Sequence, residues 1–302
     1  MMVVPLAHVG SGTWAPLQLL PPTAAILAYT LRSRTLAAHG RPVPKRRQLS
    51  FAAGMLLIYA SLVSPVAHLG GELVLAHMAQ HLLMADLGAL LIVLGLTGPL
   101  LQPLLGLPYV GRLRVLANPA VALPLWILDL YVWHLPALYQ AALHSQAVHA
   151  LEHTSFVFFG ITMWMALFGP LPQPEWFGNG AKLLYIIGVR LAGALLGNVF
   201  IWSGSVFYPD YHGGEAYWSI SRLNDQGIAG TIMMIEGSIV TIVLFGWLFL
   251  KTAREAEERQ LLLEYAEQHG LDLSEARAAR AVGAGRGAEL RRRLERTAAG
   301  ST

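Results

Sequence analysis

Histidine is the residue type with which this chain could bind a metal ion. Six histidines fall near the ends of apolar segments: His68, His77, His81, His134, His149 and His153. Two pairs, His77 with His81 and His149 with His153, have the spacing HxxxH, which places both side chains on one helix face. Each pair could bind one ion or contribute a ligand to each of two. Since the chain has no cysteine, a soft metal ion would have to be bound by methionine.

A methionine and three acidic residues accompany these histidines. Met84 follows His81 by three residues, and a thioether beside imidazoles favours Cu(I). Asp86, Asp129 and Glu152 fall within apolar segments, where ionisable side chains are rare and usually functional. These carboxylates are candidates for orienting the ligand histidines through hydrogen bonds. The two aspartates could instead line a proton path.

The segments that must position these residues are predicted to be membrane spans. Of the 302 residues, 55% are hydrophobic and 13% are charged, whereas soluble domains carry about 25% charged residues. A membrane helix needs about 20 mostly apolar residues. We therefore predict an all-α integral membrane bundle of seven transmembrane helices. The predicted spans are residues 17–31, 51–69, 73–96, 119–138, 147–168, 182–203 and 227–250.

The basic residues predict how this bundle is oriented. Six of them lie between the first two predicted spans, Arg112 and Arg114 lie after the third, and Lys182 opens the sixth. Because positively charged loops stay in the cytoplasm, this pattern places the N-terminus outside and the C-terminus in the cytoplasm. The six candidate histidines then lie near the outer face of the membrane.

A change in composition divides the chain into two domains. Residues 1–250 are predicted to form the transmembrane domain, and residues 251–302 a charged, helical cytoplasmic tail. Within the tail, Ser274 has the character of a helix start after the break at Gly270. The tail is expected to be solvated, or to dock a partner or anionic lipid headgroups.

Three stretches of the sequence, each containing histidine, are similar to the sequences of a known protein family. They are residues 77–84 (HMAQHLLM), 133–143 (WHLPALYQAAL) and 149–153 (HALEH), in that order. Together they resemble the multi-spanning CtaG family of assembly factors for caa-type cytochrome c oxidases, over roughly residues 51–250. The resemblance implies a bacterial inner-membrane protein, with oxidase subunits and other copper chaperones as partners. It also implies copper delivery to the oxidase. The family pattern matches at His77, His81, His134, His149 and His153.

Other functions remain open at the level of the sequence. Histidines from two helices could ligate haem b for electron transfer, or could only join helices in a metal-free scaffold. Paired HxxxH motifs also occur in di-iron membrane enzymes, but those place the metals on the cytoplasmic side. We expect no enzyme, because the chain has no convincing catalytic triad, phosphate loop or dinucleotide fingerprint. Basic residues confined to a few segments argue against nucleic-acid binding.

Overall fold

The computed structural model describes residues 16–107 and 109–300, and every element in these ranges is a helix. The N-terminal residues 1–15, whose outside location the charge pattern predicts, lie outside the described ranges. The chain divides into two compact units, Met1–Ile239 and Val240–Thr302. All seven predicted spans are helical over most of their length. The all-α prediction is therefore confirmed for the described residues.

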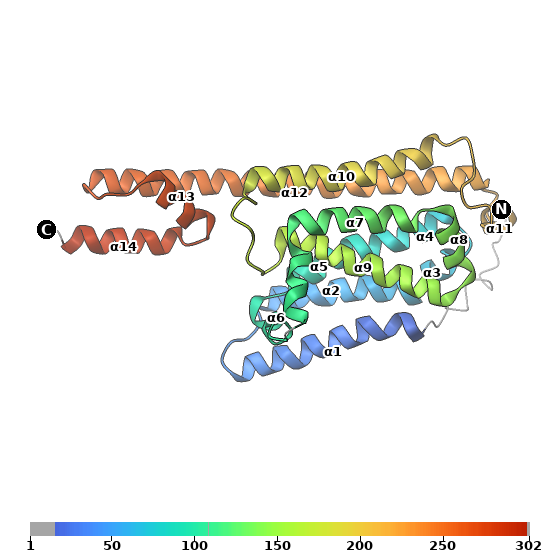
Figure 1. Ribbon diagram of the computed structural model, residues 1–302, viewed down its shortest axis with the longest axis horizontal. Coiled ribbons are helices and arrows are strands. Elements are labelled where there is room, and N and C mark those ends of the chain that lie inside the picture. Colours follow the sequence, from blue (N-terminus) through green and yellow to red (C-terminus); the bar gives the residue numbers. More distant parts are fainter. Residues whose placement is uncertain (1–15, 108, 301–302) are drawn as a thin grey trace, which may run out of the picture. The chain divides into compact units, whose positions relative to one another are not determined.

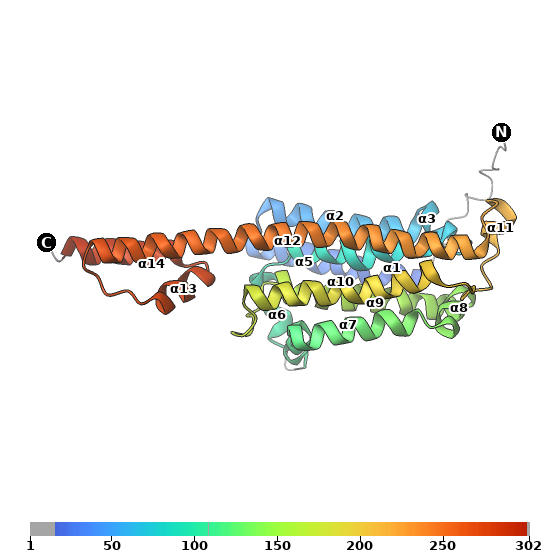
Figure 2. The same cartoon turned by 90° about the horizontal axis from the view of Figure 1, so that it is seen from above.

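The first half of the larger unit supplies one histidine pair and the helices around it. Its elements are α1 (Pro16–Ala38), α2 (Lys45–Val63), α3 (Pro65–Leu69), α4 (Val74–His81), the π-helix η2 (Leu82–Gly88) and α5 (Ala89–Gly95). In both views α2 runs alongside α5 (Figure 1 and Figure 2). Gly54 permits this approach, because a Cβ there would lie 2.7 Å from the Gly88 carbonyl oxygen.

The second half supplies the other pair. Its elements are α6 (Gly98–Leu105), the 3-10 helix η3 (Val110–Ala117), α7 (Pro119–Trp133), α8 (Pro136–His144), α9 (Gln146–Phe168), α10 (Asn179–Trp202), α11 (Gly213–Tyr217) and α12 (Arg222–Gln268). Helix α9 packs against α5, η2 and α7, and so lies at the centre of the larger unit (Figure 1). Side chains on α9 can therefore reach those on α4.

Four helical segments among the described residues are long and apolar enough to cross a membrane: Val74–Gly95, Gln146–Phe168, Asn179–Trp202 and Arg222–Gln268. A fifth is counted if α7 and α8, which are bent by 69° relative to each other, form one span. Helices α1 and α2 are 23 and 19 residues long, but they do not meet the same criterion. Both contain arginines near one end, which lowers their mean hydropathy.

Two predicted spans are interrupted rather than continuous. The second predicted span breaks at Ser64, whose side chain accepts from the Val66 amide to start α3. The fourth ends at Trp133, and His134 occupies the break before α8 begins at Pro136. Proline has no amide hydrogen and disfavours helical geometry in the preceding residue, which explains why both breaks precede a proline.

The two ends of the larger unit differ in chemistry. The α1–α2 loop, α6 and η3 lie at one end, and α3, α8 and α11 lie at the other (Figure 1). At the first end, Arg47 donates to the Leu94 and Leu96 carbonyls at 3.0 and 2.8 Å, and Arg32 donates to the Pro99 carbonyl. These contacts bring basic residues of α1 and α2 to the same end as the η3 arginines. The histidines lie toward the opposite end.

The smaller unit has its own core. The last part of α12, α13 (Glu275–Gly283) and α14 (Gly287–Gly300) bury Leu262, Val282, Leu290 and Leu294 against one another. Ser274 accepts a hydrogen bond from the Arg277 amide, so the predicted helix start is confirmed. The predicted division after residue 250 falls inside α12, which continues to Gln268 without a break.

Candidate metal centre

Three histidines and one glutamate from two helices form a compact buried group: His77, His81, Glu152 and His153. Each residue offers one possible ligand atom, and these atoms all lie within 4.8 Å of one another. The histidines are 1–4% exposed and Glu152 is fully buried. Helix α4 supplies two members one turn apart, and α9 supplies two adjacent residues. We call these four residues the metal group.

The spacing within the metal group leaves its polar atoms without hydrogen bonds. The Nε2 of His77 lies 3.6 Å from one Glu152 oxygen, and the Nε2 of His81 lies 3.8 Å from the other. Both distances exceed hydrogen-bond length. Among the described residues, the Nε2 atoms of all three histidines and both Glu152 oxygens have no hydrogen-bond partner. Because buried polar atoms are normally paired, this set of atoms indicates that something else satisfies them.

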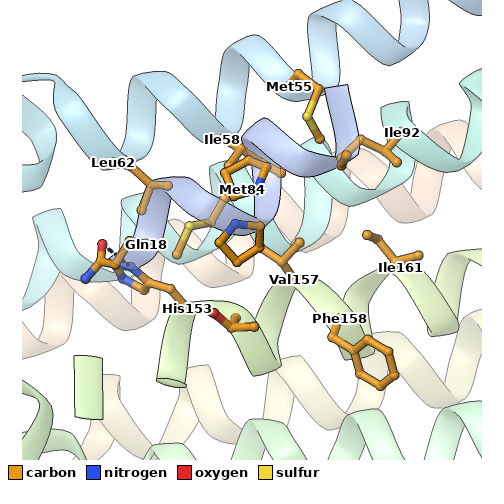
Figure 3. A pocket seen from close by; sticks show the side chains of 14 residues that line it. Gln18, Met55, Ile58, Leu62, Met84, Ile92, His153, Val157, Phe158 and Ile161 are labelled. Carbon is orange, nitrogen blue, oxygen red and sulfur yellow. Dashed lines mark hydrogen bonds between the residues drawn. The ribbon is translucent and has the colours of Figure 1, made fainter. Parts of the chain in front are cut away.

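Hydrogen bonds at the other ring nitrogen orient two of the histidines. The His77 Nδ1 lies 3.3 Å from the Gly70 carbonyl oxygen, and His153 Nδ1 lies 3.2 Å from the Gln18 side-chain oxygen (Figure 3). Since the Gln18 oxygen only accepts, Nδ1 of His153 carries the proton and donates it, whereas His77 Nδ1 also meets the Tyr211 hydroxyl, which can donate or accept. In His153 that tautomer leaves the Nε2 lone pair free to bind a metal ion, the arrangement that usually accompanies a metal-binding histidine.

A buried layer of tyrosines covers the same group. The Tyr211 hydroxyl lies 2.8 Å from His77 Nδ1, and Tyr208 donates to the His134 carbonyl at 2.9 Å. Tyr139 stacks on Tyr208 with 3.9 Å between ring centroids. Burial raises the pKa of both Tyr208 and Tyr211, which lie in the loop before α11, so both remain neutral phenols at physiological pH. The layer therefore buries one face of the His77 ring.

Helix α4 is fixed at its N-terminus by a residue far along the chain. The two Asp225 oxygens accept from the backbone amides of Val74 and Leu75, at 2.8 and 2.9 Å. These amides have no partner within the helix, and a carboxylate at this position also interacts favourably with the helix dipole. Asp225 thus holds the first turn of α4, which begins three residues before His77.

The other predicted ligands lie around the metal group but outside it. The His149 ring is 4.1 Å from that of His153 and 5.3 Å from that of His77, between centroids. His134 is buried in the break after α7, where its Nδ1 donates to the Leu130 carbonyl at 2.6 Å. His68 pairs with Glu72, with 3.5 Å between Nδ1 and the nearer carboxylate oxygen.

Met84 lies in different surroundings. It is fully buried and lines an apolar cavity of about 230 Å³ between α1, α2, η2 and α9, which His153 also lines. Figure 3 shows the two side chains in this cavity with Met55 and Ile58. A thioether and one histidine of the metal group therefore line the same cavity.

The three predicted orienting acids have separate surroundings. Glu152 stands between the histidines of the metal group, as described above. The Asp129 side chain accepts from Trp133 Nε1 at 3.1 Å, and the Asp86 side chain meets that of Glu236. Among the described residues, neither aspartate hydrogen-bonds to a histidine of the group.

Gln18, Gln80 and Tyr211 contact the site but were not predicted from the sequence. Gln80 is 1% exposed and lies between the two α4 histidines in the chain. A glutamine within an apolar span is energetically costly unless its side chain has a hydrogen-bond partner. The positions of Gln18 and Gln80 within predicted spans could therefore have marked both residues as candidates. Tyr211 lies in a polar loop, and the sequence carries no comparable signal for it.

The donor atoms of the metal group limit which metal ions it can bind. They are three imidazole nitrogens and a carboxylate oxygen. Imidazole ligands bind Cu, Zn, Fe and Ni, whereas carboxylates favour the harder ions of this range. The metal group therefore fits a divalent ion such as Cu(II) through its nitrogen and oxygen donors. Met84, which lines a cavity together with His153, is a softer donor of the kind that Cu(I) prefers.

Comparison with known proteins identifies one family. A family model described as cytochrome c oxidase caa3 assembly factor matches residues 27–255, which cover most of the chain and include every residue of the metal group. No curated protein matches the chain. No solved structure matches it either.

Proposed function

The chain belongs to the cytochrome c oxidase caa3 assembly factor family, and from this premise we propose that it binds copper and delivers it to a haem–copper oxidase. The observation that carries the proposal is the metal group, whose inward nitrogen and oxygen atoms lack hydrogen bonds. His77, His81, Glu152 and His153 bind the ion. Glu152 acts as a ligand rather than only as an orienting acid, since its two oxygens face two different histidines.

The proposed setting is a bacterial inner membrane crossed seven times. Four spans come from the helices that satisfy the length and apolarity criterion, α7 and α8 together form a fifth, and α1 and α2 add two. Placing the arginine-rich end in the cytoplasm puts the N-terminus and the metal group toward the outer face. Copper then arrives from outside the cell membrane, where copper chaperones are the proposed donors. Oxidase subunits in the same membrane are the proposed recipients.

The remaining predicted ligands have supporting roles in this proposal. His149 and His134 flank the metal group and serve as alternative ligands during transfer. The chain acts as a carrier rather than as an enzyme, with copper as its cargo. Membrane lipid surrounds it, and it has no role in nucleic-acid binding.

Haem b is a weaker alternative on geometric grounds. A porphyrin held by two histidines must fit between their rings, but the His77 and His81 rings are 4.3 Å apart and the His81 and His153 rings 5.3 Å apart, between centroids. Glu152 occupies the space between them. A metal-free scaffold is disfavoured because it would leave several buried polar atoms without partners.

Metal analysis of the protein purified in detergent tests the proposal. We expect copper near one ion per chain by mass spectrometry, lost in the His77→Ala/His81→Ala variant, with no Soret band. A His39→Ala/His269→Ala variant is the matched control, because both residues are exposed and neither belongs to the metal group. A Soret band would favour haem, and a folded wild-type protein without copper or haem would favour the scaffold. In cells that carry the His77→Ala/His81→Ala variant, oxidase activity should fall as well.

Replacing Met84 with leucine is expected to separate the two oxidation states of copper. Leucine fills a similar volume, so the stability should change by less than about 1.5 kcal/mol. Loss of the thioether should weaken Cu(I) binding about tenfold and leave Cu(II) binding unchanged, because imidazole and carboxylate donors suffice for Cu(II). Competition with a Cu(I) chelator measures the first affinity. Met55→Leu, in the same cavity, is the control, and equal Cu(I) affinities in all three proteins would exclude Met84 as a ligand.

A further inference from the structure

Two cavities reach the metal group, and they differ in chemistry. The apolar cavity with Met84 and Met55 touches the group only through His153 (Figure 3). The second, of about 500 Å³, lies at the histidine end of the larger unit and touches the group through His77. Its lining includes His68, Glu72, Gln80, His77 and His149. We call the second cavity the vestibule.

The vestibule presents a buried oxygen that has no hydrogen-bond partner. The Gln80 side chain is 1% exposed, and its nitrogen donates to the Ser61 carbonyl at 2.8 Å. That bond fixes the amide, so its oxygen cannot exchange places with the nitrogen without losing the bond. Among the described residues this oxygen has no partner. A fixed, buried acceptor in a polar cavity favours a cation or its hydrating water.

The lining of the vestibule carries a second pair of possible ligand atoms. His68 and Glu72 are about one-fifth exposed at their side chains, with 3.5 Å between His68 Nδ1 and a Glu72 oxygen. That nitrogen has no hydrogen-bond partner among the described residues. Imidazole and carboxylate are the same two donor types that form the metal group, here on partly exposed side chains, although the His68 Nδ1 atom itself is buried.

His149 is a further possible ligand, which lines the vestibule and also lies beside the metal group. It lines the vestibule, its Nε2 has no hydrogen-bond partner in the described chain, and its ring lies beside those of His77 and His153. At about 500 Å³, the vestibule is large enough for a cation together with water molecules. A cation could therefore exchange its water for protein ligands stepwise.

We propose that the vestibule is the entry route for copper, with His68 and Glu72 as the site that first binds the ion. The ion then passes Gln80 and His149 and reaches the metal group through His77. This inference rests on the proposed function, because it takes the metal group as the destination. It adds a transient site and a direction of entry, which affect the rate of loading rather than the final amount bound.

Glu72→Gln tests the first binding site. With Cu(II) as the probe, we expect loading of the metal-free protein to be about tenfold slower, while the final copper content equals that of the wild type. Glu215→Gln is the matched control, because Glu215 is a half-exposed acid at the same end of the unit that does not line the vestibule. It should load at the wild-type rate.

Blocking the vestibule provides an independent test. Since the chain has no cysteine, one introduced thiol can be labelled selectively. Gly71 lines the vestibule, and a Cβ there would meet only the His68 carbonyl oxygen, at an acceptable 3.4 Å. A bulky, neutral thiol reagent on Gly71→Cys should slow Cu(II) loading at least tenfold. The same label on Gly204→Cys, where a Cβ would meet nothing within 4 Å, should not.

The outcomes separate this inference from the proposed function. Unchanged loading rates in Glu72→Gln and in labelled Gly71→Cys would overturn the entry route while leaving the metal group intact. A reduced final copper content at a normal loading rate would also overturn it, by making Glu72 a resident ligand. A wild-type protein that binds no copper would refute the metal group, and the route with it.

Discussion

Replacing Glu152 with glutamine is expected to lower copper affinity at least about 100-fold. The substitution keeps the volume of the side chain and removes the only negative charge of the metal group. Changes to residues that merely orient metal ligands cost 10–100-fold in affinity, so loss of a charged ligand should cost at least the upper end of that range. His77, His81 and His153 remain in place, which keeps the variant close to the wild type in structure.

Thermal unfolding with and without copper measures this effect. At a free copper concentration about 1,000 times the dissociation constant, binding should stabilise the wild type by about 4 kcal/mol. For a domain of this size that corresponds to a rise in Tm on the order of 10 °C. At the same concentration the variant should gain only about 1.4 kcal/mol. Glu175→Gln, the same change at an exposed position, should keep the full rise, and equal rises in all three proteins would contradict the role of Glu152.

The histidine spacing predicted that the two HxxxH pairs share one end of the bundle, but not which of their residues come together in the metal group. The HxxxH pairs share an end of the bundle because each lies in the first turns of a long apolar helix, and this can be read from periodicity. Which side chains meet depends on how α4 and α9 rotate about their axes. That rotation is set by packing between helices, so the sequence could not place Glu152 in the metal group and His149 beside it.

Contacts between distant parts of the chain were also beyond prediction. Gln18 reaches His153 across 135 positions, and Asp225 caps α4 across 151. Local patterns carry no information about such pairs. By contrast, Ser274 was identifiable as a helix start, because an N-cap interaction involves residues only two or three apart.

The number of spans illustrates a different limit. Length and apolarity identify α9 and α10 clearly, since each offers more than 20 uninterrupted residues. The segment containing His134 has a suitable composition, but Pro136 ends its helix and turns the chain by 69°. Composition averaged over a window does not distinguish one straight span from two bent helices.

Gly160 sets the distance between the two helices that form the metal group. A Cβ at Gly160 would clash with the Ala85 carbonyl oxygen, which belongs to the backbone of η2 and cannot rotate away. Ala85 comes one turn after His81, and Gly160 comes about two turns after Glu152 and His153. The close approach at this contact therefore brings the ligands of α9 within reach of those of α4.

Gly160→Ala is consequently expected to destabilise the protein and weaken copper binding together. Alanine ordinarily stabilises a helix by about 0.5–1 kcal/mol relative to glycine, and Gly193→Ala should show this gain because a Cβ on Gly193 would meet nothing within 4 Å. At Gly160 overpacking should cost about 1–3 kcal/mol instead. Thermal unfolding of the metal-free proteins should thus move in opposite directions for the two variants. Copper titration should show weaker binding only for Gly160→Ala, because displacement of α9 separates Glu152 and His153 from the α4 histidines. If both variants gained stability and kept full affinity, the Gly160 contact would not control the geometry of the site.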